Sequence, residues 1–499
     1  MKVTKLFENT DAKIFGNKNA EVAHISNDSR DIKKNYVFFA ISGANTDGNV
    51  YIKQALKKGA SAIVSESEPI KLSKNLESKT AWIKTSNILK TLSTISSKFY
   101  GKPSRKLKII GLTGTNGKTT ASYILEAIYK EAKIKTGIIG TISHRIGNKT
   151  ILKAANTTPS SHQLQLLLKT MVNKKVKATI MEVSSHSLSL NRVNDIDFDR
   201  AVFTNFQRDH LDFHKNKKNY FDAKLKLFDF LSKSPKRGKF AIINNDDIKA
   251  PDILKKFKSK LSFITYGVDN KADFSAKNIS FLKNKTCFEL SFPNGKKEIA
   301  LKLLGKHNIY NALCAAATAY SLNISISAII KGLENIGNIP GRLERISSNL
   351  NFDVFVDYAH TDAAIENVLS NLINLPHKRM ITVFGCGGDR DRGKRATMGI
   401  ISCSLSNIAI ITNDNPRNES PTQIFQDIEK GLKTKKLKNY EIIPSRKKAI
   451  DKAIKLAKKG DIVLIAGKGH EDYQILNGRI IHFDDREIVK EAIKKRIAS

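Results

Sequence analysis

The segment "KIIGLTGTNGKTTASYILEAIY", from Lys108 to Tyr129, joins an apolar run to a helix-like pattern through a turn rich in glycine and threonine. Residues 108–112 have the composition of a buried strand, and the residues from Thr119 onward have the apolar spacing of an amphipathic helix. A turn of small residues here lets backbone N–H groups face an anion at the positive end of the helix. The segment therefore predicts a phosphate-binding loop, with Lys118 reaching the outer phosphates and the Thr119 hydroxyl binding Mg²⁺.

The loop departs from the plain Walker pattern G-x-x-x-x-G-K-T, because Leu112 occupies the first glycine position and Gly111 stands one place earlier. Gly114 and Gly117 remain, so the chain can still turn tightly. The alternative is a Gly-rich turn without a ligand. The ordered succession of strand, loop, Lys-Thr and helix counts against it, and we expect the chain to bind a nucleoside triphosphate.

The length of the chain and two segments that contain Gly and Pro predict three domains. The chain has 499 residues, and a typical domain has about 150. The stretch "YGKPSRK" looks like a linker and "IGNIPGRLERI" marks a second boundary, because Gly and Pro interrupt regular structure. The predicted domains are 1–102, 103–338 and 339–499.

Several features predict a cytoplasmic protein. No run reaches the roughly 18 to 20 apolar residues that a membrane span needs. The N-terminal "MKVTKLFENTDAKIFG" lacks the apolar core of a signal peptide. The four cysteines, Cys287, Cys314, Cys386 and Cys403, are scattered, which favours reduced thiols over a disulfide framework or a zinc site.

The net charge of +38 raises the alternative of a nucleic-acid-binding protein. However, the lysines are spread over the whole chain in short pieces such as "KNKK" and "KTKKLK", and no aromatic RNA-binding motif accompanies them. The pattern favours lysine on solvated faces, and we expect no nucleic-acid partner.

Apolar strand-like runs alternate with helical patterns from Leu107 onward. Those before the second boundary are "LKIIGLT", "ATIMEVS", "RAVFTNF" and "KFAIINND"; those after it are "FDVFVDYA", "RMITVFGCG", "NIAIITND" and "DIVLIAGKG". This alternation predicts an α/β fold with mostly parallel, doubly wound sheets, whose ligands lie beyond the carboxyl ends of the strands.

Polar clusters follow two of these strands. Glu182 ends "ATIME", where a carboxylate suits Mg²⁺ but is often merely solvated. The segment "TNFQRDHLDFH" (204–214) contains Arg208, Asp209 and His210, and its spacing leaves open a metal and phosphate site or a polar loop with a helix cap. Lys224, in "NYFDAKLKLFDFL", borders an apolar stripe, and its pattern alone favours a surface lysine.

The second half of the chain contributes loops that suit an amino acid. In "TNDNPRNESP" the Asn-Pro-Arg turn places Arg417 at a sheet edge, where a guanidinium can bind a carboxylate through two hydrogen bonds. Arg390 could complete a clamp, and Glu471 could hold an ammonium group. The alternative for each loop taken singly is ordinary turn chemistry.

Together, "GLTGTNGKTT", "NTTPS", "EVSSHSL", "TNFQRDHLDFH", "AKLKLF", "GKHNIYNALCAA", "PGRLE", "VDYAHT", "GCGGDRDRGKR", "DNPR" and "GKGHEDYQ" resemble the Mur ligase family, essentially end to end. The resemblance implies an N-terminal UDP-sugar-binding domain, a central P-loop ATPase and a C-terminal Rossmann-like domain for the incoming amino acid. It also implies ligase activity in peptidoglycan precursor synthesis.

The resemblance implies a role for each matching residue. ATP would be bound by Gly114, Thr115, Asn116, Gly117, Lys118, Thr119 and Thr120, with Asn308, Arg342 and Asp357 across the cleft and His360 nearby. The UDP-sugar would contact Asn27, Ser29, Ala44, Asn45 and Thr46, and its peptidyl arm Asn156, Thr157, Thr158, Ser184 and Arg192. The metal ligands would be Thr119, Glu182, His210 and Lys224, the last as a carbamate. This role for Lys224 is the opposite of the surface position that its sequence pattern alone favours. Lys118, Lys224, His210 and Glu182 would be catalytic.

Within the family, "DNPR" (Asp414, Asn415, Pro416, Arg417) is similar to the signature of members that add meso-diaminopimelate rather than lysine. Arg417 would pair with the second carboxylate of diaminopimelate, which lysine lacks. Arg390, Gly467 and Glu471 match the rest of that pocket. The implied partners are UDP-MurNAc-L-Ala-D-Glu, meso-diaminopimelate, ATP and Mg²⁺, and we expect a monomer.

Three positions depart from the family pattern. Leu190 stands where relatives usually carry Gln, "HTDAAI" lacks a proline common after His-Thr, and Ser445 replaces an acidic residue. The alternatives to this reading are a lysine-adding ligase, folylpolyglutamate synthase, and a nucleic-acid-binding NTPase.

Overall fold

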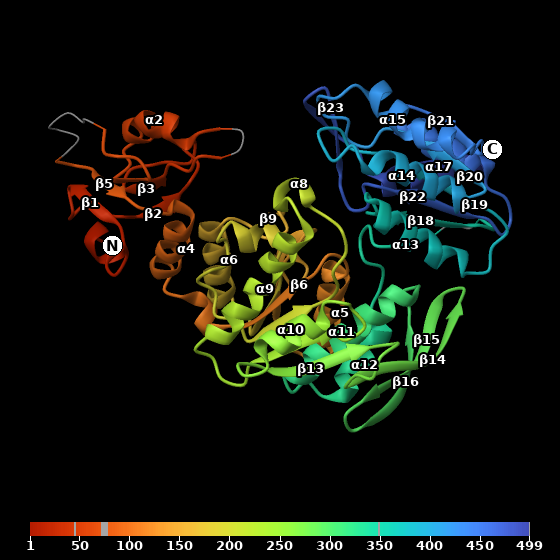
Figure 1. Ribbon diagram of the computed structural model, residues 1–499, viewed down its shortest axis with the longest axis horizontal. Coiled ribbons are helices and arrows are strands. Elements are labelled where there is room, and N and C mark those ends of the chain that lie inside the picture. The colour runs from red at the N-terminus through yellow and green to blue at the C-terminus, as the bar shows by residue number, and fades with distance from the viewer. Residues whose placement is uncertain (44–45, 71–77, 348–349, 499) are drawn as a thin grey trace.

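The computed structural model describes residues 1–43, 46–70, 78–347 and 350–498. Three large β-sheets follow one another along the chain. Each sheet and the helices that cover it form one unit, and the first and third units lie on either side of the second (Figure 1). The predicted α/β class with mostly parallel sheets is confirmed. Each sheet lies inside one of the three predicted ranges, while the domain boundaries themselves stay predictions.

The first sheet has five strands in the order β1-β5-β4-β3-β2, and β1 alone runs antiparallel to its neighbour. The strands are β1 (Lys13–Gly16), β2 (His24–Ser26), β3 (Tyr36–Phe39), β4 (Ala62–Ser65) and β5 (Ala81–Lys84). The helical segments are α1 (Val3–Phe7), η1 (Gly48–Tyr51), α2 (Ile52–Lys57) and α4 (Ile88–Phe99). Because α4 contacts α6 (Ser161–Asn173) of the second unit, it connects the two units (Figure 1).

The second sheet has eleven strands in the order β16-β15-β14-β13-β12-β11-β6-β10-β7-β8-β9. The parallel part consists of β14 (Phe274–Leu282), β13 (Ser262–Gly267), β12 (Phe240–Asn244), β11 (Arg200–Phe203), β6 (Lys108–Thr113), β10 (Ala178–Glu182) and β7 (Thr136–Ile139). Antiparallel strands extend it at both edges: β8 (Ser143–Ile146) and β9 (Lys149–Lys153) at one, β15 (Lys285–Phe292) and β16 (Gly295–Leu301) at the other. These edge strands were not predicted from the sequence.

Two hydrophobic layers cover this sheet because successive strand residues face opposite sides. Ile110 packs with residues of α5, α11 and α12, whereas Ile109 packs with residues of α6, α9 and α10. The helices are α5 (Lys118–Glu131), α6 (Ser161–Asn173), α7 (Ser185–Ser189), α8 (Leu211–His214), α9 (Lys217–Lys233), α10 (Ala250–Phe257), α11 (Lys306–Ser321) and α12 (Ile326–Asn335). Strand β6 therefore lies between both layers, and its carboxyl end opens into the phosphate loop.

The third sheet has six strands in the order β17-β18-β22-β19-β20-β21, with β17 antiparallel. They are β17 (Glu344–Ile346), β18 (Asp353–Asp357), β22 (Ile462–Ala466), β19 (Met380–Phe384), β20 (Ile408–Ile411) and β21 (Tyr440–Ile442). Helices α13 (Asp362–Ile373), α14 (Lys394–Ser404) and α15 (Pro421–Thr434) pack on one face, and α16 (Arg446–Leu456) and α17 (Asp485–Ala498) on the other. The hairpin β23 (Tyr473–Leu476) and β24 (Arg479–His482) stands apart.

The segment expected to be a linker is ordered. Residues Pro103–Lys106 form a 3-10 turn (η2), Pro103 and Ser104 are buried, and the Ser104 hydroxyl accepts a hydrogen bond from the Asp197 N–H at 3.2 Å. The stretch therefore packs against the second unit, because its proline and serine find partners there.

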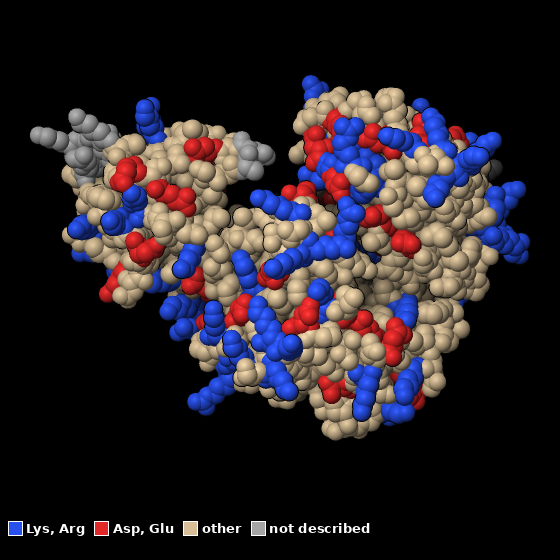
Figure 2. Space-filling view, in the orientation of Figure 1, with Lys and Arg blue, Asp and Glu red and all other residues tan. Residues whose placement is uncertain are grey.

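Two surface properties bear on function. Across the described residues, no helix combines the length and apolarity needed to cross a membrane. Lys and Arg are distributed over all three units on the face seen in Figure 2, with acidic residues between them.

Candidate functional site

The phosphate loop requires glycine at two positions. Gly114 has a φ of +146°, and a Cβ there would lie 1.9 Å from Thr204 Oγ1 at the end of β11. Gly117 has a φ of +87°, and its Cβ would lie 2.4 Å from Asn311 Oδ1 on α11. Asn311 in turn donates a hydrogen bond to Asn308 Oδ1 at 3.0 Å. The loop therefore turns tightly where two other elements approach its backbone, as the two remaining glycines of the motif predict.

Two lysines approach the loop from different helices. Lys118 Nζ donates hydrogen bonds to the backbone oxygens of Gly114 and Thr115, each at 2.9 Å, and Lys224 Nζ donates to the same Gly114 oxygen at 2.8 Å. Lys224 is almost fully buried, with its Nζ 4.2 Å from the centre of the Tyr220 ring. Burial, followed by the nearby positive charge of Lys118, lowers the pKa of Lys224 well below its ordinary value. The surface position that its helical pattern suggested is wrong.

Glu182, at the end of β10, is the centre of a buried hydroxyl cluster. Its Oε2 accepts hydrogen bonds from the hydroxyls of Thr119 at 2.8 Å and Thr141 at 2.9 Å, and its Oε1 accepts one from the Thr141 N–H at 3.1 Å. The Thr141 hydroxyl also lies 3.1 Å from that of Thr157. Thr141 was missed in the sequence, where its one signal is its position just after the apolar strand β7.

Two hydrogen bonds, made by Thr158 and Arg192, attach the loop at residues 156–158 to the end of β10. The Thr158 hydroxyl donates to the Glu182 backbone oxygen at 2.8 Å, and Arg192 Nη1 donates to the Thr158 backbone oxygen at 2.8 Å. The segment 156–158 is thereby held beside the end of β10. Its polar side chains are in place to meet a ligand that reaches the phosphate loop.

His210 begins the short helix α8 with a φ of +51°. Its Nε2 lies 3.3 Å from Asp209 Oδ2, its ring centre is 4.7 Å from that of His186, and burial lowers its pKa. A neutral imidazole is the form that binds a metal ion. In the described part of the chain, no group of three or more His, Cys, Asp or Glu side chains is arranged to hold a metal by itself.

Arg342 lies in the connection between the second and third units, just before β17, and Asp357 ends β18 of the third sheet. Arg342 Nη2 donates to the Thr119 hydroxyl at 3.3 Å, and its guanidinium lies 5.0 Å from the centre of the Tyr358 ring. Asp357 accepts hydrogen bonds from the N–H groups of Leu343 at 2.6 Å and Ala359 at 2.8 Å, and burial raises its pKa. Asp357 therefore holds the connecting segment that places Arg342 against the phosphate loop.

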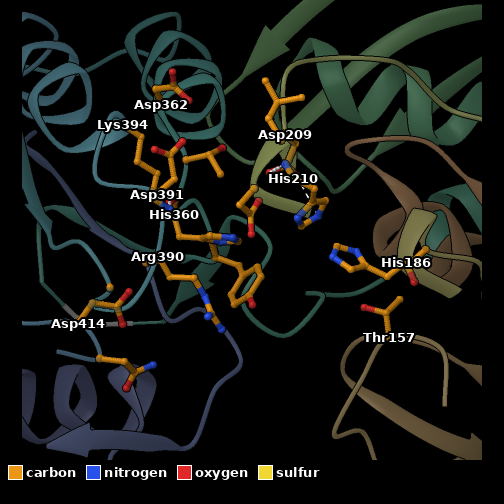
Figure 3. A pocket seen from close by; sticks show the side chains of 18 of the residues that line it. Thr157, His186, Asp209, His210, His360, Asp362, Arg390, Asp391, Lys394 and Asp414 are labelled. Carbon is orange, nitrogen blue, oxygen red and sulfur yellow. Dashed lines mark hydrogen bonds and ion pairs between the residues drawn. The ribbon is translucent and has the colours of Figure 1, made fainter. Parts of the chain in front are cut away.

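A cavity of about 580 Å³ lies between the second and third units. In Figure 3, Thr157, His186 and His210 face it from one side, and Arg390, Asp391 and Asp414 from the other. The predicted site residues that line it are Asn156, Thr157, Ser184, Arg192, His210, Arg390, Asp414, Asn415, Arg417, Gly467 and Glu471, together with His360, which was expected near the nucleotide. Residues far apart in sequence, predicted to bind two different substrates, are thus brought together.

The remaining predicted site residues do not line this cavity. They include Gly114, Thr115, Asn116, Gly117, Lys118, Thr119, Thr120, Thr158, Glu182, Lys224, Asn308, Arg342, Asp357 and Pro416. Asn27, Ser29 and Thr46 belong to the first unit, where the Ser29 hydroxyl donates to Gln54 Oε1 at 2.9 Å. Ala44 and Asn45 lie outside the described residues.

The arginines predicted to bind the amino acid are held by backbone oxygens. Arg417 has a φ of +55°, and its Nη1 donates to the Gly388 oxygen at 2.7 Å. Arg390 Nη1 donates to the Asp389 oxygen at 3.1 Å. Neither guanidinium has an ion-pair partner among the described residues, so both can pair with a carboxylate that enters the cavity.

Three successive parts of the chain match domains of one family. The Mur ligase family catalytic domain matches residues 21–100, the Mur ligase middle domain residues 112–319, and the Mur ligase glutamate ligase domain residues 341–469. The chain belongs to the Mur ligase family, and the expectation of an ATP-dependent ligase is confirmed.

Individual relatives resemble it over its full length. A protein from Clostridium botulinum (strain ATCC 19397 / Type A), named UDP-N-acetylmuramoyl-L-alanyl-D-glutamate–2,6-diaminopimelate ligase, is 45% identical over 477 residues, covering 95% of this chain and 96% of that protein. A solved structure of a ligase of the same name is 30% identical, with a TM-score of 0.69 and complete coverage of both chains. The MurF ligase of Thermotoga maritima in complex with ADP shares the fold, at 18% identity, a TM-score of 0.64, and coverage of 95% and 98%.

Proposed function

We propose that this protein joins meso-2,6-diaminopimelate to the γ-carboxylate of the D-glutamyl residue of UDP-N-acetylmuramoyl-L-alanyl-D-glutamate, with cleavage of ATP to ADP and phosphate. Relatives at 40 to 45% identity over nearly the whole chain carry the name of this activity. The single observation that supports it most is the shared cavity. One wall carries His210 beside the phosphate loop, and the other carries Arg390 and Arg417.

The reaction follows from the position of the phosphate loop. The substrate carboxylate would attack the γ-phosphorus of ATP, giving an acyl phosphate and ADP. The amine of diaminopimelate would then attack the acyl carbon and release phosphate. Lys118 and the loop N–H groups would neutralise the charge that develops on the transferred phosphoryl group. Enclosure between two units would keep water from the acyl phosphate.

The residues around Glu182 fit a magnesium ion. Mg²⁺ takes mainly oxygen ligands, which the Glu182 carboxylate and the Thr119 hydroxyl would supply, and the neutral His210 would add a ring nitrogen. When bound, the ion would compensate phosphate charge. Lys224 would contribute as a carbamate, which turns a cation into an oxygen donor. Its buried amine beside the phosphate loop supports this role.

The remaining assignments complete the proposal. The first unit, with Asn27, Ser29, Ala44, Asn45 and Thr46, would bind the UDP-sugar, and the loops at Asn156, Thr157, Thr158, Ser184 and Arg192 its peptidyl arm. Arg390, Gly467, Glu471 and residues 414–417 would hold diaminopimelate. We expect a cytoplasmic monomer, because these substrates are soluble and the cavity needs no second copy to complete its walls.

Phosphate release from ATP tests the proposal, with UDP-MurNAc-L-Ala-D-Glu present and either meso-diaminopimelate or L-lysine added. Turnover that needs the muropeptide and strongly prefers diaminopimelate is expected. Equal use of lysine would overturn the specificity while leaving the ligase intact. Stimulation by DNA or RNA in place of either amino acid would overturn the proposed function altogether.

A further inference from the structure

Lys468 is a buried cation inside the wall that carries Arg417. Its side chain is 0% exposed. Its Nζ lies 3.2 Å from Glu471 Oε2, 3.3 Å from Asn415 Oδ1 and 3.7 Å from Asp414 Oδ1, and 5.3 Å from the centre of the Tyr473 ring. Three of these four neighbours are side chains from the proposed amino-acid site, and all four line the cavity.

The backbone fixes this lysine in place. Gly467 and Gly469, on either side of it, have φ values of +123° and +54°. A Cβ at Gly469 would lie 2.7 Å from Tyr358 Cβ, so the loop passes directly against β18 and its following residue. Burying an ammonium group costs free energy unless it is paired. The contacts of Lys468 with Glu471, Asn415 and Asp414 therefore compensate its buried charge.

Lys468 uses part of the hydrogen-bonding capacity of the acidic side chains. Glu471 Oε2 accepts from Lys468 and from Asn415 Nδ2 at 3.1 Å, which leaves Glu471 Oε1 with the Tyr358 hydroxyl at 3.4 Å. Asp414 Oδ1 is buried and, within the described part of the chain, makes no hydrogen bond. Lys468 therefore faces Glu471 Oε2 and Asp414 Oδ1, which leaves the other oxygen of each acid, Glu471 Oε1 and Asp414 Oδ2, for an incoming ammonium group.

We propose that Lys468 is a specificity-determining positioning residue: it holds Asp414, Asn415 and Glu471 and cancels one of their two negative charges, so that the pocket accepts an ammonium group only together with a carboxylate. This inference rests on the proposed function. It assigns a role to a residue that need not touch the substrate.

The charge balance explains the selectivity. With Lys468 present, the two acids carry one net negative charge beside Arg417 and Arg390. The second centre of diaminopimelate brings an ammonium and a carboxylate, and each finds an opposite charge. The side-chain ammonium of lysine brings only positive charge and leaves the arginines unpaired in a desolvated site. Without Lys468 the site is more negative, which favours a lone ammonium group.

The pH dependence of binding gives an independent readout. Burial raises the pKa of Glu471, the charge of Lys468 opposes this, and Asp414 adds to it. Tyr358, Tyr473 and Arg446 also interact electrostatically with this carboxyl. Loss of the Lys468 charge raises the pKa of Glu471 further. The acid limb of kcat/KM for diaminopimelate therefore moves to higher pH, an effect that a loss of packing alone would not produce.

The test compares kcat/KM for meso-diaminopimelate and for L-lysine in the full-length protein and in Lys468→Met. We expect the lysine-to-diaminopimelate ratio to rise about tenfold or more, the effect of one charged interaction in a buried site. Lys447→Met removes an exposed lysine of α16 and should leave the ratio unchanged. Thermal unfolding and ADP binding to the phosphate loop report whether the variant is folded.

A double variant separates charge from packing. Asp414→Asn with Lys468→Met keeps the summed charge of positions 414, 468 and 471 at its original value, so the ratio should return toward that of the unmodified protein. A ratio unchanged in Lys468→Met, or not restored in the double variant, would overturn the inference. If the unmodified protein shows no diaminopimelate-dependent turnover, the proposed function fails, and the inference fails with it. If the unmodified protein does turn over diaminopimelate but Lys468→Met leaves the lysine-to-diaminopimelate ratio unchanged, only the inference fails.

Discussion

Lys118 and Lys224 donate hydrogen bonds to one backbone oxygen, that of Gly114, at 2.9 and 2.8 Å. Two ammonium groups at one acceptor in a buried site repel each other, and burial lowers the pKa of both. The two lysines have different consequences for chemistry. Lys118 begins α5 at the loop itself, whereas Lys224 comes from α9 and has no acidic side chain within ion-pair distance among the described residues.

Lys224 should bind carbon dioxide. A neutral amine is the reactive form, and a lowered pKa makes that form available near neutral pH. Protein equilibrated with ¹³C-bicarbonate is expected to show a carbamate carbon signal by NMR, stronger as pH rises. The signal should be absent from Lys224→Arg and present in Lys226→Arg, which changes a neighbouring lysine. A signal that survives in Lys224→Arg would contradict the assignment.

Replacing Lys118 with methionine should lower the rate of ATP turnover by at least about 100-fold, because the cation that would bind the outer phosphates is lost. Phosphate release at saturating substrates measures the effect. Lys130→Met removes an exposed lysine at the far end of the same helix and should retain full activity. Equal rates for the two variants would argue against a phosphate-binding loop at this position.

Arg417→Met should lower kcat/KM for diaminopimelate by about 10- to 100-fold, the size expected for a charged hydrogen bond in a buried site. The value for L-lysine should fall much less, since lysine has no second carboxylate. Parallel assays with both amino acids give the comparison. Arg479→Met, which changes an exposed arginine of the hairpin, is the matched control. Equal losses with both amino acids would mean that Arg417 supports the loop and does not select the substrate.

The ion pair of Arg446 and Asp485 should contribute strongly to stability. Both side chains are fully buried, with Arg446 Nη2 2.7 Å from Asp485 Oδ2, and Arg446 also donates to the Ala466 oxygen at 2.9 Å. Asp485→Asn is expected to cost about 3 to 5 kcal/mol, because a buried cation loses its partner. Urea denaturation measures the change. Glu491→Gln disrupts an exposed pair between the same two helices and should be indistinguishable from the unmodified protein.

The sequence was most informative where local chemistry determines the structure. The strand before the phosphate loop, the loop and α5 could be predicted because hydrophobic spacing and glycine placement are local signals. Glu182 could be placed at the carboxyl end of a strand for the same reason. The α/β class followed from the alternation of apolar runs.

Properties that depend on distant contacts could not be predicted in this way. Lys224 has a surface-like helical pattern, and its burial comes from Tyr220 and from a loop more than a hundred residues earlier. Thr141 has meaning only beside Glu182, and Lys468 only beside residues 414–415. The antiparallel strands at both edges of the second sheet were missed because they mix polar and apolar residues and lack the continuous apolar runs that mark the buried parallel strands.

The connection between the second and third units links their relative orientation to the phosphate loop. The second sheet ends at Leu301 and the third begins at Glu344, and Arg342, just before that strand, touches the Thr119 hydroxyl of the phosphate loop. A rotation of one unit against the other would move this segment relative to the loop that we propose binds the nucleotide. If nucleotide favours one angle, that angle binds nucleotide more tightly by the same factor. A pair of dyes across the two units would therefore act as a gauge of nucleotide occupancy.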